Sequence, residues 1–213
     1  MLNLRFLVSG PVAAATVFFG GPSRAQDLSQ TPASVAPDYV TQSVIDAEAL
    51  GGSVGVVAVN VAAGDANLQT NAAALAQNVN GGSTARVAAT QLANLDSNLA
   101  PDVAIARIGG HAFAGSAGLI SINQASGQAN AQANGVAFAL GIDGEAIAES
   151  VLAQTLPESV TPAEPGPPRK GLREAAIADT AFEGAQGVVQ VNQSAGSGNT
   201  TANRFALQVD AKL

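Results

Sequence analysis

One sequence pattern occurs three times in this chain, and that repetition restricts the possible fold more than any other feature. The copies are 45–75, 108–138 and 177–207, which align without a gap and share nine identical columns of Ile, Ala, Gly or Asn. A register kept across copies predicts units that stack on one another, because equivalent side chains then meet. The alternative is a low-complexity spacer rich in Asn, Ala and Gly, but a spacer requires no such register.

Each copy is predicted to form two strands joined by a bend. In the first strand Val57 and Val59 alternate with Ala58, the period of two expected when one face of a strand is buried. The other copies keep this alternation around Ile120, Ile122, Val189 and Val191. The bend reads AAGDA, ASGQA or SAGSG, and its shared glycine can adopt the positive φ of a tight turn. These turn glycines are Gly64, Gly127 and Gly196.

The second strand of each copy carries a row of amides with a period of two. An isolated hairpin of this kind is marginal in water, whereas stacking at about 4.8 Å would let each amide bond to the layers above and below. The opposite face carries small residues, such as Ala74, Ala137 and Ala206, which permit a neighbouring layer to approach closely. With the anchor asparagines, the predicted self-assembly ladder is Asn60, Asn67, Gln69, Asn71, Asn123, Asn130, Gln132, Asn134, Asn192, Asn199, Thr201 and Asn203.

The predicted fold is therefore all-β: a repeat β-solenoid or cross-β stack of three strand-bend-strand units, with partly helical or disordered linkers. The predicted divisions are a signal peptide (1–25), a polar lead-in (26–44), repeat 1 (45–75), linker 1 (76–107), repeat 2 (108–138), linker 2 (139–176), repeat 3 (177–207) and a tail (208–213).

The segment 1–25 is typical of a secretory signal peptide. Arg5 precedes an apolar run, and Ser23-Arg24-Ala25 fits a small-x-small cleavage site. A membrane anchor is a weaker interpretation, because the run is short and broken by Gly10 and Pro11. Cleavage after Ala25 removes two arginines and no acidic side chain, so the net charge falls from −7 to −9. An acidic exported chain is a poor partner for nucleic acid or an anionic membrane.

The composition argues against an ordinary globular core. Aromatic residues make up 4% of the chain, and there is no Trp and no Cys, so neither a large aromatic core nor a disulfide framework is available. We therefore expect stacking of the repeats to supply the stability.

The linkers contain patterns that favour helix. VAATQLANL in linker 1 has weak helical spacing, and in EAIAESVLAQTL of linker 2 Ile147, Val151 and Leu152 could share a helical face that ends before Pro157. A Pro-rich, extended stretch follows. LREAAIADTAF (172–182) also has good helix formers, although the alignment begins repeat 3 within it. APD occurs at 36–38 and again at 100–102, so the duplication could extend beyond the aligned window.

No motif for catalysis or metal binding is present in the sequence. His111 is the only histidine, and its column holds Glu48 and Thr180 in the other copies, which favours a surface or loop residue over a ligand. The carboxylates are scattered, so their spacing defines no catalytic pair. Two glycosylation-type triplets, at Asn192 and Asn199, are what an Asn/Ser/Thr-rich repeat produces by chance. We predict no enzyme activity and no cofactor.

GVVAVNVAAGDANLQTNAAALA and GLISINQASGQANAQANGVAFA resemble the repeats of Fap-type bacterial functional amyloids. Those subunits cross the outer membrane and polymerise into biofilm fibres, and their plan of a signal peptide and three imperfect repeats with two linkers matches most of this chain. The resemblance implies that the repeat glycines and amides form a fibre core. The major subunit typically ends in Cys-x-x-Cys, which is absent here, so the resemblance leaves open a major, minor or nucleating subunit or a more distant relative. Curli-type repeats share the pattern of recurring amides and glycines, but their units are shorter and nearly contiguous.

Two functions follow from the same fold. The first is a secreted, self-assembling subunit of an extracellular fibre, whose partners are copies of itself, related subunits and, by resemblance, an export machinery. The second is a monomeric secreted β-solenoid that acts as an adhesin or surface-binding module. A monomer is expected to cap its terminal layers, whereas a fibre subunit leaves their strands able to pair.

Overall fold

The computed structural model describes residues 39–78, 80–94, 101–142, 144–155 and 171–210. All regular structure in these residues is β, in eleven strands. In chain order they are β1 (Val40–Ile45), β2 (Val54–Ala63), β3 (Leu68–Asn78), β4 (Ser83–Asn94), β5 (Val103–Ile108), β6 (Ala117–Ser126), β7 (Ala131–Gly141), β8 (Gly144–Thr155), β9 (Leu172–Ile177), β10 (Gln186–Ala195) and β11 (Thr200–Asp210).

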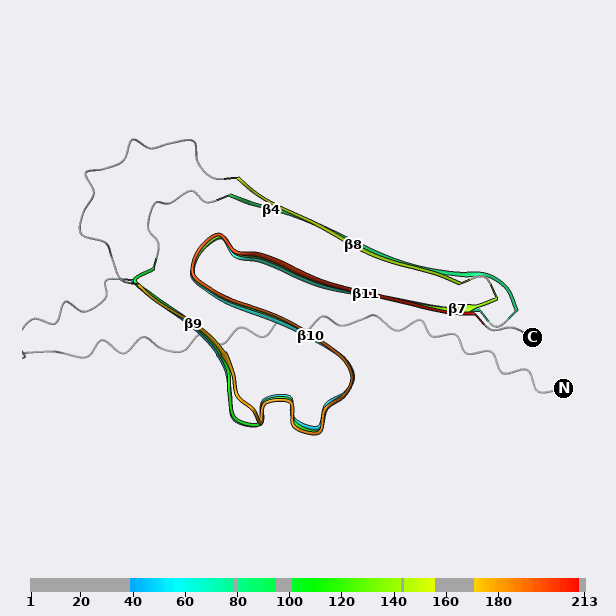
Figure 1. The fold of residues 1–213 in the computed structure, drawn as a ribbon, viewed down its shortest axis with the longest axis horizontal. Coiled ribbons are helices and arrows are strands. Elements are labelled where there is room, and N and C mark those ends of the chain that lie inside the picture. The colour runs from blue at the N-terminus through cyan, green and yellow to red at the C-terminus, as the bar shows by residue number, and fades with distance from the viewer. Residues whose placement is uncertain (1–38, 79, 95–100, 143, 156–170, 211–213) are drawn as a thin grey trace, which may run out of the picture.

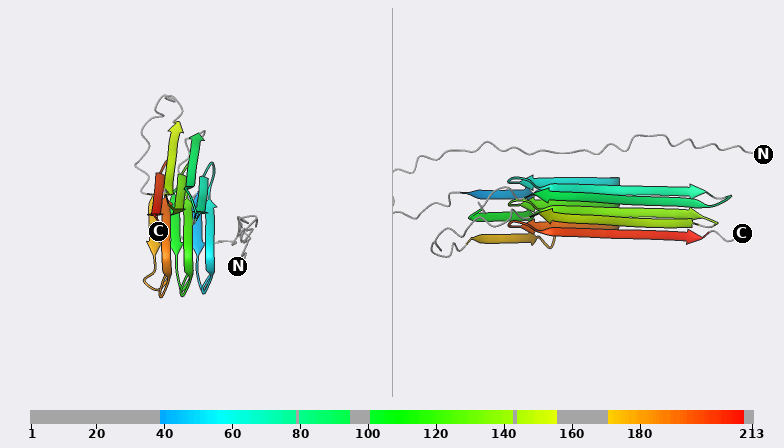
Figure 2. Two further views of the ribbon diagram at one scale, coloured as in Figure 1. Left: turned by 90° about the vertical axis from the view of Figure 1, so that its right-hand side faces the viewer. Right: turned by 90° about the horizontal axis from the view of Figure 1, so that it is seen from above.

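The strands form four parallel sheets, and successive strands of each sheet come from successive layers of the chain. Sheet A has the order β1-β5-β9, sheet B β2-β6-β10, sheet C β3-β7-β11, and sheet D contains β4 and β8. Layer 1 is therefore β1 to β4, layer 2 is β5 to β8, and layer 3 is β9 to β11. In Figure 1 the layers lie almost on top of one another, and Figure 2 shows them side by side. The predicted all-β stack is confirmed.

Equivalent residues of the repeats are hydrogen-bonded neighbours in these sheets. Asn123 lies between Asn60 and Asn192 in sheet B, and Asn134 lies between Asn71 and Asn203 in sheet C. Residues that align without a gap between the repeats are thus the residues that pair in the sheets. The repeat is longer than the aligned window, because β1, β5 and β9 also pair in register ahead of it.

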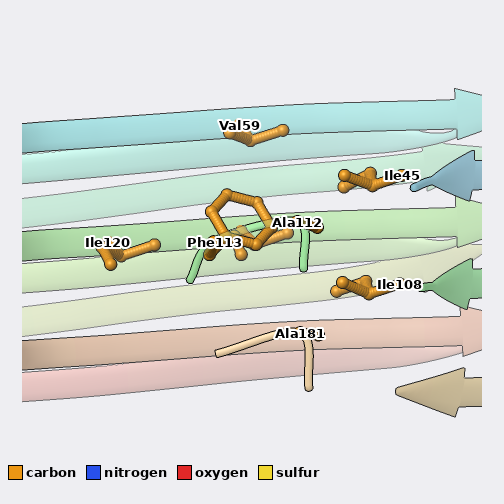
Figure 3. Packing of buried hydrophobic residues seen from close by; sticks show 8 residues of the cluster. Ile45, Val59, Ile108, Ala112, Phe113, Ile120 and Ala181 are labelled. Atoms are coloured by element: carbon orange, nitrogen blue, oxygen red, sulfur yellow. The ribbon is translucent and has the colours of Figure 1, made fainter. Parts of the chain in front are cut away.

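The apolar core lies between sheets A and B, where the chain turns between them. Ile45, Val59 and Phe113 belong to one buried cluster, and Figure 3 shows side chains of this cluster from all three layers. The Phe113 and Phe182 rings stack at 5.1 Å with 6° between their planes. Val59 and its equivalent Ile122 face this core, as the alternation in the first strand predicts.

The expectation that the linkers are partly helical is wrong within the described residues. The segments with weak helical spacing form β4 and β8, which pair over their whole length and pack on sheet C. In β4, buried Ala85, Val87 and Ala89 alternate with exposed Arg86 and Ala88, so its true period is two. Short alanine-rich segments are compatible with both the helical period and the strand period of two. Packing against the flat alanine face of sheet C favours the strand here. The Pro-rich stretch lies outside the described residues.

The small-residue face of the second strand has the close neighbour that its composition predicts. Ala137 and Ala139 of β7 are 0% and 1% exposed and pack against Ala85 of β4. Partly buried alanines of β3 and β8 complete this cluster. The neighbour is sheet D, which comes from the segments expected to be linkers, so those segments are not excursions from the stack.

The apparent helix at 172–182 is also a strand followed by a turn. β9 pairs with β5 from Leu172 to Ile177, and the chain then turns in the same way as the preceding layer. Parallel pairing and burial in the stack override the helix propensity of these residues. The APD copy at 36–38 and the expected signal peptide lie outside the described residues. The part of the chain that the structure describes contains no apolar helix of membrane-spanning length.

Candidate self-assembly surfaces and the amide ladders

Asparagines from sheets B and C meet in pairs across the space between the two sheets. Nδ2 of Asn71 donates to Oδ1 of Asn60 at 2.9 Å. Asn134 and Asn123 form the same bond at 3.0 Å in layer 2, as do Asn203 and Asn192 in layer 3. The anchor asparagines and the amide row, read separately in the sequence, are therefore one network.

The same asparagines are also bonded along the stack. Nδ2 of Asn123 donates to Oδ1 of Asn60 at 3.0 Å, and Nδ2 of Asn192 donates to Oδ1 of Asn123 at the same distance. In sheet C the bonds from Asn134 to Asn71 and from Asn203 to Asn134 measure 2.8 and 3.1 Å. These side chains form two continuous ladders through the three layers.

A third ladder follows the bend between sheets B and C. Nδ2 of Asn130 donates to Oδ1 of Asn67 at 2.8 Å, and Nδ2 of Asn199 donates to Oδ1 of Asn130 at 2.7 Å. Asn130 also donates to the carbonyl of Gly196 at 3.0 Å. Asn123, Asn130 and Asn134 are all fully buried, so their hydrogen-bonding capacity must be met inside the stack.

All three asparagine ladders have the same direction. In each, layer 3 donates to layer 2 and layer 2 donates to layer 1. The two ends of the molecule consequently differ. At layer 1 the amide nitrogens lack an acceptor from a further described layer, although Asn67 already donates to Gly127 O, and Asn71 to Val59 O and Asn60 Oδ1. At layer 3 amide oxygens remain without a donor. Within the described residues, nothing donates to Oδ1 of Asn199 or Asn203.

Asn60 shows the incomplete bonding at layer 1 most clearly. Its equivalent Asn123 directs Nδ2 at three acceptors of the preceding layer: Asn60 Oδ1, Thr70 O and Asn71 Oδ1. Asn192 repeats this set on layer 2, with Ala133 O in place of Thr70 O. No described layer precedes Asn60, and its Nδ2 donates to no described residue.

The glutamine positions form a less regular row. Gln69 Nε2 donates to Gln132 Oε1 at 2.8 Å, whereas Gln132 Nε2 turns to Ser194 Oγ at 3.0 Å. The equivalent residue in layer 3 is Thr201, whose Oγ1 is buried without a hydrogen-bond partner. A buried unpaired hydroxyl is unfavourable, so Thr201 is an incompletely satisfied site at the layer 3 end.

The predicted turn glycines are required by the spacing of the layers. Gly64, Gly127 and Gly196 all have positive φ, between 96° and 122°. A Cβ on Gly127 would lie 1.8 Å from the carbonyl oxygen of Gly196, which no side chain can tolerate. A second row of this kind, Gly55, Gly118 and Gly187, belongs to the identical columns but was not among the predicted site residues. A Cβ on Gly118 would lie 2.1 Å from Gly55 O.

Sequence reasoning also missed a polar network between sheets A and B. Gln124 Nε2 donates to the carbonyls of Ser43 and Arg107, both at 2.9 Å, and Gln193 continues the row with a 2.8 Å bond to Gln124. Val61 takes this place in layer 1, so the column is not identical across copies. Glutamine at the same position in two of the three copies was the available signal.

Charged side chains lie at the surface, away from the ladders. Arg86 and Glu149 pair at 3.2 Å on sheet D, and Arg107 and Glu174 pair at 2.7 Å on sheet A. The hydrogen bond and charge of Glu174 raise the pKa of Arg107. His111 lies in the loop after sheet A, and about half of its side chain is exposed. The described residues contain no group of three or more His, Cys, Asp or Glu side chains that could hold a metal ion.

Three of the four sheets are open at both ends of the stack. The layer 1 end presents β1, β2 and β3, and the layer 3 end presents β9, β10 and β11. Figure 2 shows these flat ends, and no described residue covers them. Each end therefore offers unpaired backbone groups in three strands together with one end of each asparagine ladder.

The comparisons with known proteins agree with these features. No solved structure matches this chain. The model of the functional amyloid protein FapB/FapC family matches residues 23–210, which include all three layers. This match spans most of the sequence, and the chain therefore belongs to the functional amyloid protein FapB/FapC family.

Proposed function

We propose that this functional amyloid protein is a secreted subunit of an extracellular fibre and that it elongates head to tail. The layer 1 end of one copy meets the layer 3 end of the copy before it. The observation that carries this proposal is the incomplete bonding of Asn60. The acceptors that its Nδ2 lacks have equivalents at the layer 3 end, namely Asn192 Oδ1, Ala202 O and Asn203 Oδ1.

Head-to-tail contact would extend three sheets without changing their register. β2 would add beside β10 and β3 beside β11, at the strand spacing of about 4.8 Å that already separates the layers. Asn71 would then donate to Asn203, and Asn67 to Asn199, in the direction that every internal rung of these ladders has. The reverse pairing, of two layer 1 ends, would oppose donors to donors.

The unpaired hydroxyl of Thr201 supports the same contact. In the extended stack its neighbour is Gln69 of the next copy, because these residues occupy one column of sheet C. Oε1 of Gln69 accepts no hydrogen bond from any described residue, so the Thr201 hydroxyl can donate to it. Assembly would thereby satisfy a buried group that a single copy leaves unpaired.

Gly55, at the layer 1 end, is also consistent with a layer from a preceding copy. A Cβ on Gly55 would meet nothing within 4 Å in a single copy, whereas the equivalent Gly118 sits against Gly55. In the extended stack Gly55 would sit in the same way against Gly187 of the preceding copy. The bare ends also expose Val54 (82%) and Val56 (62%), which assembly would cover.

We further propose that the role is structural rather than catalytic, and that the subunit reaches the cell surface through the periplasm. The signal-like residues 1–25 and the family's description as functional amyloid support this route. Whether it is the major, minor or nucleating subunit is decided by its abundance in isolated fibres.

The test is incubation of the chain that begins at Gln26, followed by negative-stain microscopy and fibre diffraction. We expect unbranched fibrils with one reflection at about 4.7 Å and another at about 10 Å, the spacings between strands and between stacked sheets. A chain that remains monomeric for days at high concentration, with a cooperative thermal transition, would instead be the capped monomeric adhesin or binding module.

A further inference from the structure

Arg173 differs from the small residues with which it pairs. In sheet A it pairs with Ala104, which in turn pairs with Thr41, and both of these smaller residues are buried. Arg173 belongs to layer 3, at an open end of the stack, and it is exposed. A long cationic side chain therefore stands at the layer 3 end, where the other two layers have a small one.

The side chain of Arg173 lies across the space between the start of sheet A and the bend that joins sheets B and C. Its Cδ and Nε lie 3.2 and 3.3 Å from where a Cβ on Gly196 would be, and its Cζ lies 2.9 Å from where a Cβ on Gly171 would be. Its Nη1 donates to the carbonyls of Leu172 and Asp102, at 3.0 and 3.2 Å. The guanidinium is thus held beside the residue that precedes β9.

Tyr39 crosses the same space in layer 1. It precedes β1 as Gly171 precedes β9, and its hydroxyl donates to Oδ2 of Asp65, in the bend, at 3.2 Å. Gln128 of layer 2 donates to the Tyr39 hydroxyl at 3.3 Å. Layer 2 therefore contacts Tyr39 from one side, and the other side faces the layer 1 end, where the preceding copy would stack.

The bend of layer 3 contains an unpaired hydroxyl. Ser197 occupies the position that Asp65 has in layer 1 and Gln128 has in layer 2. Its Oγ is buried and has no hydrogen-bond partner among the described residues. Because a buried hydroxyl without a partner is unfavourable, the layer 3 end has a donor at the bend that an acceptor from a further layer would satisfy.

We propose that Arg173 and Ser197 form an anion-binding site that receives the Asp65 carboxylate of the next copy. In the head-to-tail stack Asp65 lies one layer beyond Ser197 in the same column, and the Tyr39 ring bonded to it lies over the Arg173 guanidinium. The layer spacing of about 4.8 Å is within the range of about 6 Å for a cation–π contact. This inference rests on the proposed head-to-tail assembly, for which it names a contact that selects the partner end.

The site distinguishes the two ends of an incoming copy. Two layer 3 ends brought together would oppose Arg173 to itself, and two layer 1 ends would oppose Asp65 to itself. Both of these arrangements are repulsive, whereas opposite ends bring the cation and the carboxylate together. The contact thereby adds charge complementarity to the direction that the asparagine ladders already have.

The acidic turn after sheet A lies too far away to oppose this contact. Asp179 of layer 3 and Asp46 and Glu48 of layer 1 lie at that turn, beyond the other end of β9. The strand from Arg173 to its last residue alone spans about 13 Å, which exceeds the Debye length of about 8 Å at physiological salt. Repulsion among those carboxylates is therefore a separate effect.

Charge reversal in two different chains tests the contact. Asp65→Lys places cations at both ends of a copy, and Arg173→Glu places anions at both. Each variant alone should assemble poorly, with a soluble concentration at equilibrium roughly tenfold or more above that of wild type. In a mixture, alternation of the two chains restores opposite charges at every junction, so the soluble concentration should return close to that of wild type.

Strict alternation is a readout that a loss of folding stability cannot imitate. When one variant is present in excess, the pelleted fibrils should still contain equal numbers of the two chains by mass spectrometry. A single chain that carries both substitutions again has opposite charges at its two ends, so it should assemble alone.

The matched control reverses an ion pair that lies within one copy. Arg86 and Glu149 pair on the outer face of sheet D, with 61% and 55% of their side chains exposed. Arg86→Glu and Glu149→Lys make the same changes of charge, but their partners belong to the same chain. Mixing these two variants should therefore give no gain over the separate chains and no fixed composition.

The outcomes separate the contact from the fibre. A rescued mixture with equal numbers of the two chains supports the contact. If either variant alone assembles like wild type, or if the mixture assembles no better than its components, the contact is overturned while wild-type fibrils keep the proposed function standing. If wild-type chains form no fibrils, the proposed function itself fails, and the contact fails with it.

Fluorescence of Tyr39 gives a second readout that needs no charge reversal. Tyr39 is the only tyrosine in the sequence, which has no tryptophan, so tyrosine emission reports on this position alone. In wild-type fibrils the Arg173 guanidinium should cover the ring and lower its quenching by acrylamide several-fold relative to the soluble chain. Arg173→Ala fibrils should regain part of that quenching. Equal quenching in wild-type and Arg173→Ala fibrils would overturn the stacking of Tyr39 on Arg173.

Discussion

The side-chain amide of Asn134 donates a 2.8 Å hydrogen bond to Oδ1 of Asn71, which precedes it by 63 residues and lies one layer away. The same Nδ2 donates to Oδ1 of Asn123 across the sheets and to the carbonyl of Ile122, both at 3.0 Å. One asparagine thus joins two layers and two sheets. Replacing such a residue by its carboxylate analogue nearly keeps its shape, removes the donor and adds a negative charge at neutral pH, so the ladders can be tested specifically.

The first prediction concerns Asn67→Asp, Asn130→Asp and Asn199→Asp combined. Stacked carboxylates about 4.8 Å apart would repel by roughly 3 to 4 kcal/mol at an effective dielectric of 20, and each lost donor would cost about 1 kcal/mol or more. We expect thioflavin-positive assembly to be abolished or greatly delayed at neutral pH. Protonation near pH 3 to 4 removes the charge and restores a donor, so assembly should partly recover there.

The matched control for this triple variant is Gln77→Glu, Asn80→Asp and Gln186→Glu. It makes the same change of charge and functional group at three exposed positions outside the ladders. We expect only a small change in lag time. Equal delays for the two triple variants would mean that net charge, and not the asparagine ladder, controls assembly.

A second prediction concerns Gly55→Ala. Gly55 has a φ of 111°, and the added methyl group finds open space in a single copy. In the fibre it would meet a backbone oxygen of the preceding copy about as closely as a Cβ on Gly118 meets Gly55. We therefore expect elongation from wild-type seeds to stop, as measured by seeded thioflavin kinetics.

Gly52→Ala is the control for backbone strain. Gly52 also has positive φ, 67°, and open space around it. In the same column, a Cβ on Gly115 meets nothing within 4 Å, and one on Gly184 meets its nearest backbone atom at 3.9 Å. This variant should lower folding stability by about 1 kcal/mol and still elongate. If both variants elongate alike, the glycine row does not lie at a subunit junction.

The third prediction concerns the unpaired hydroxyl of Thr201. Thr201→Val keeps the shape of the side chain and removes a buried group that has no partner in one copy. The fibre would lose the proposed bond to Gln69, worth about 1 kcal/mol, so the soluble concentration at equilibrium should rise about fivefold. Thr200→Val, at the adjacent exposed position, should leave it unchanged. If the Thr201→Val chain assembles as well as wild type, the Thr201 hydroxyl forms no hydrogen bond at the junction.

The sequence was sufficient to predict the stack and its register, because equivalent residues sit at matching positions of each repeat. The repeats align readily on Asn60, Asn123 and Asn192. In a stack of parallel strands in register, residues of one alignment column are neighbours on adjacent strands. The cross-sheet contact of Asn60 with Asn71 was not predicted. It follows from their symmetric placement about the bend at 64–66, but only if the two strands face each other through side chains rather than pair as a hairpin.

β4 and β8 could not be recognised from repetition, because layer 3 provides no third copy within the described residues. Their alanines also fit a helical face as well as a strand. The strand conformation is favoured by the flat face around Ala137, against which a second sheet packs closely. The fold of these segments thus depends on a surface that other parts of the chain create, which local pattern does not contain.

A fourth prediction follows from the strand assignment of β4. Val87 is 5% exposed and lies close to Gly135 of sheet C, whereas Ala88 faces solvent. Val87→Asp would bury a carboxylate without a partner and should destabilise the stack by several kcal/mol. Ala88→Asp adds the same charge outside. We expect hydrogen exchange of sheets C and D to rise sharply only for Val87→Asp; unchanged exchange in both would mean that sheet D is not part of the core.

The last prediction concerns the long connection between β8 and β9. The sequence predicts that its Pro-rich part is a linker. Sixteen residues separate Thr155 from Leu172 (172 − 155 − 1), whereas eight separate Asn94 from Val103 (103 − 94 − 1). Because the layers stack in register, both connections join equivalent places in the fold. Deleting residues 163–170 leaves a connection of eight residues, enough to reach β9.

We expect this deletion to leave the rate of fibril formation and the strand-spacing reflection nearly unchanged, since shortening a loop by half changes its closure free energy by only about 0.6 kcal/mol. The control removes eight residues from β8 instead, 146–153, and should prevent ordered assembly because sheet D then loses the strand that covers β7 and β11. If the two deletions slow assembly equally, residues 163–170 belong to the core of the fibre, and the division of the chain into layers and linker must be redrawn there.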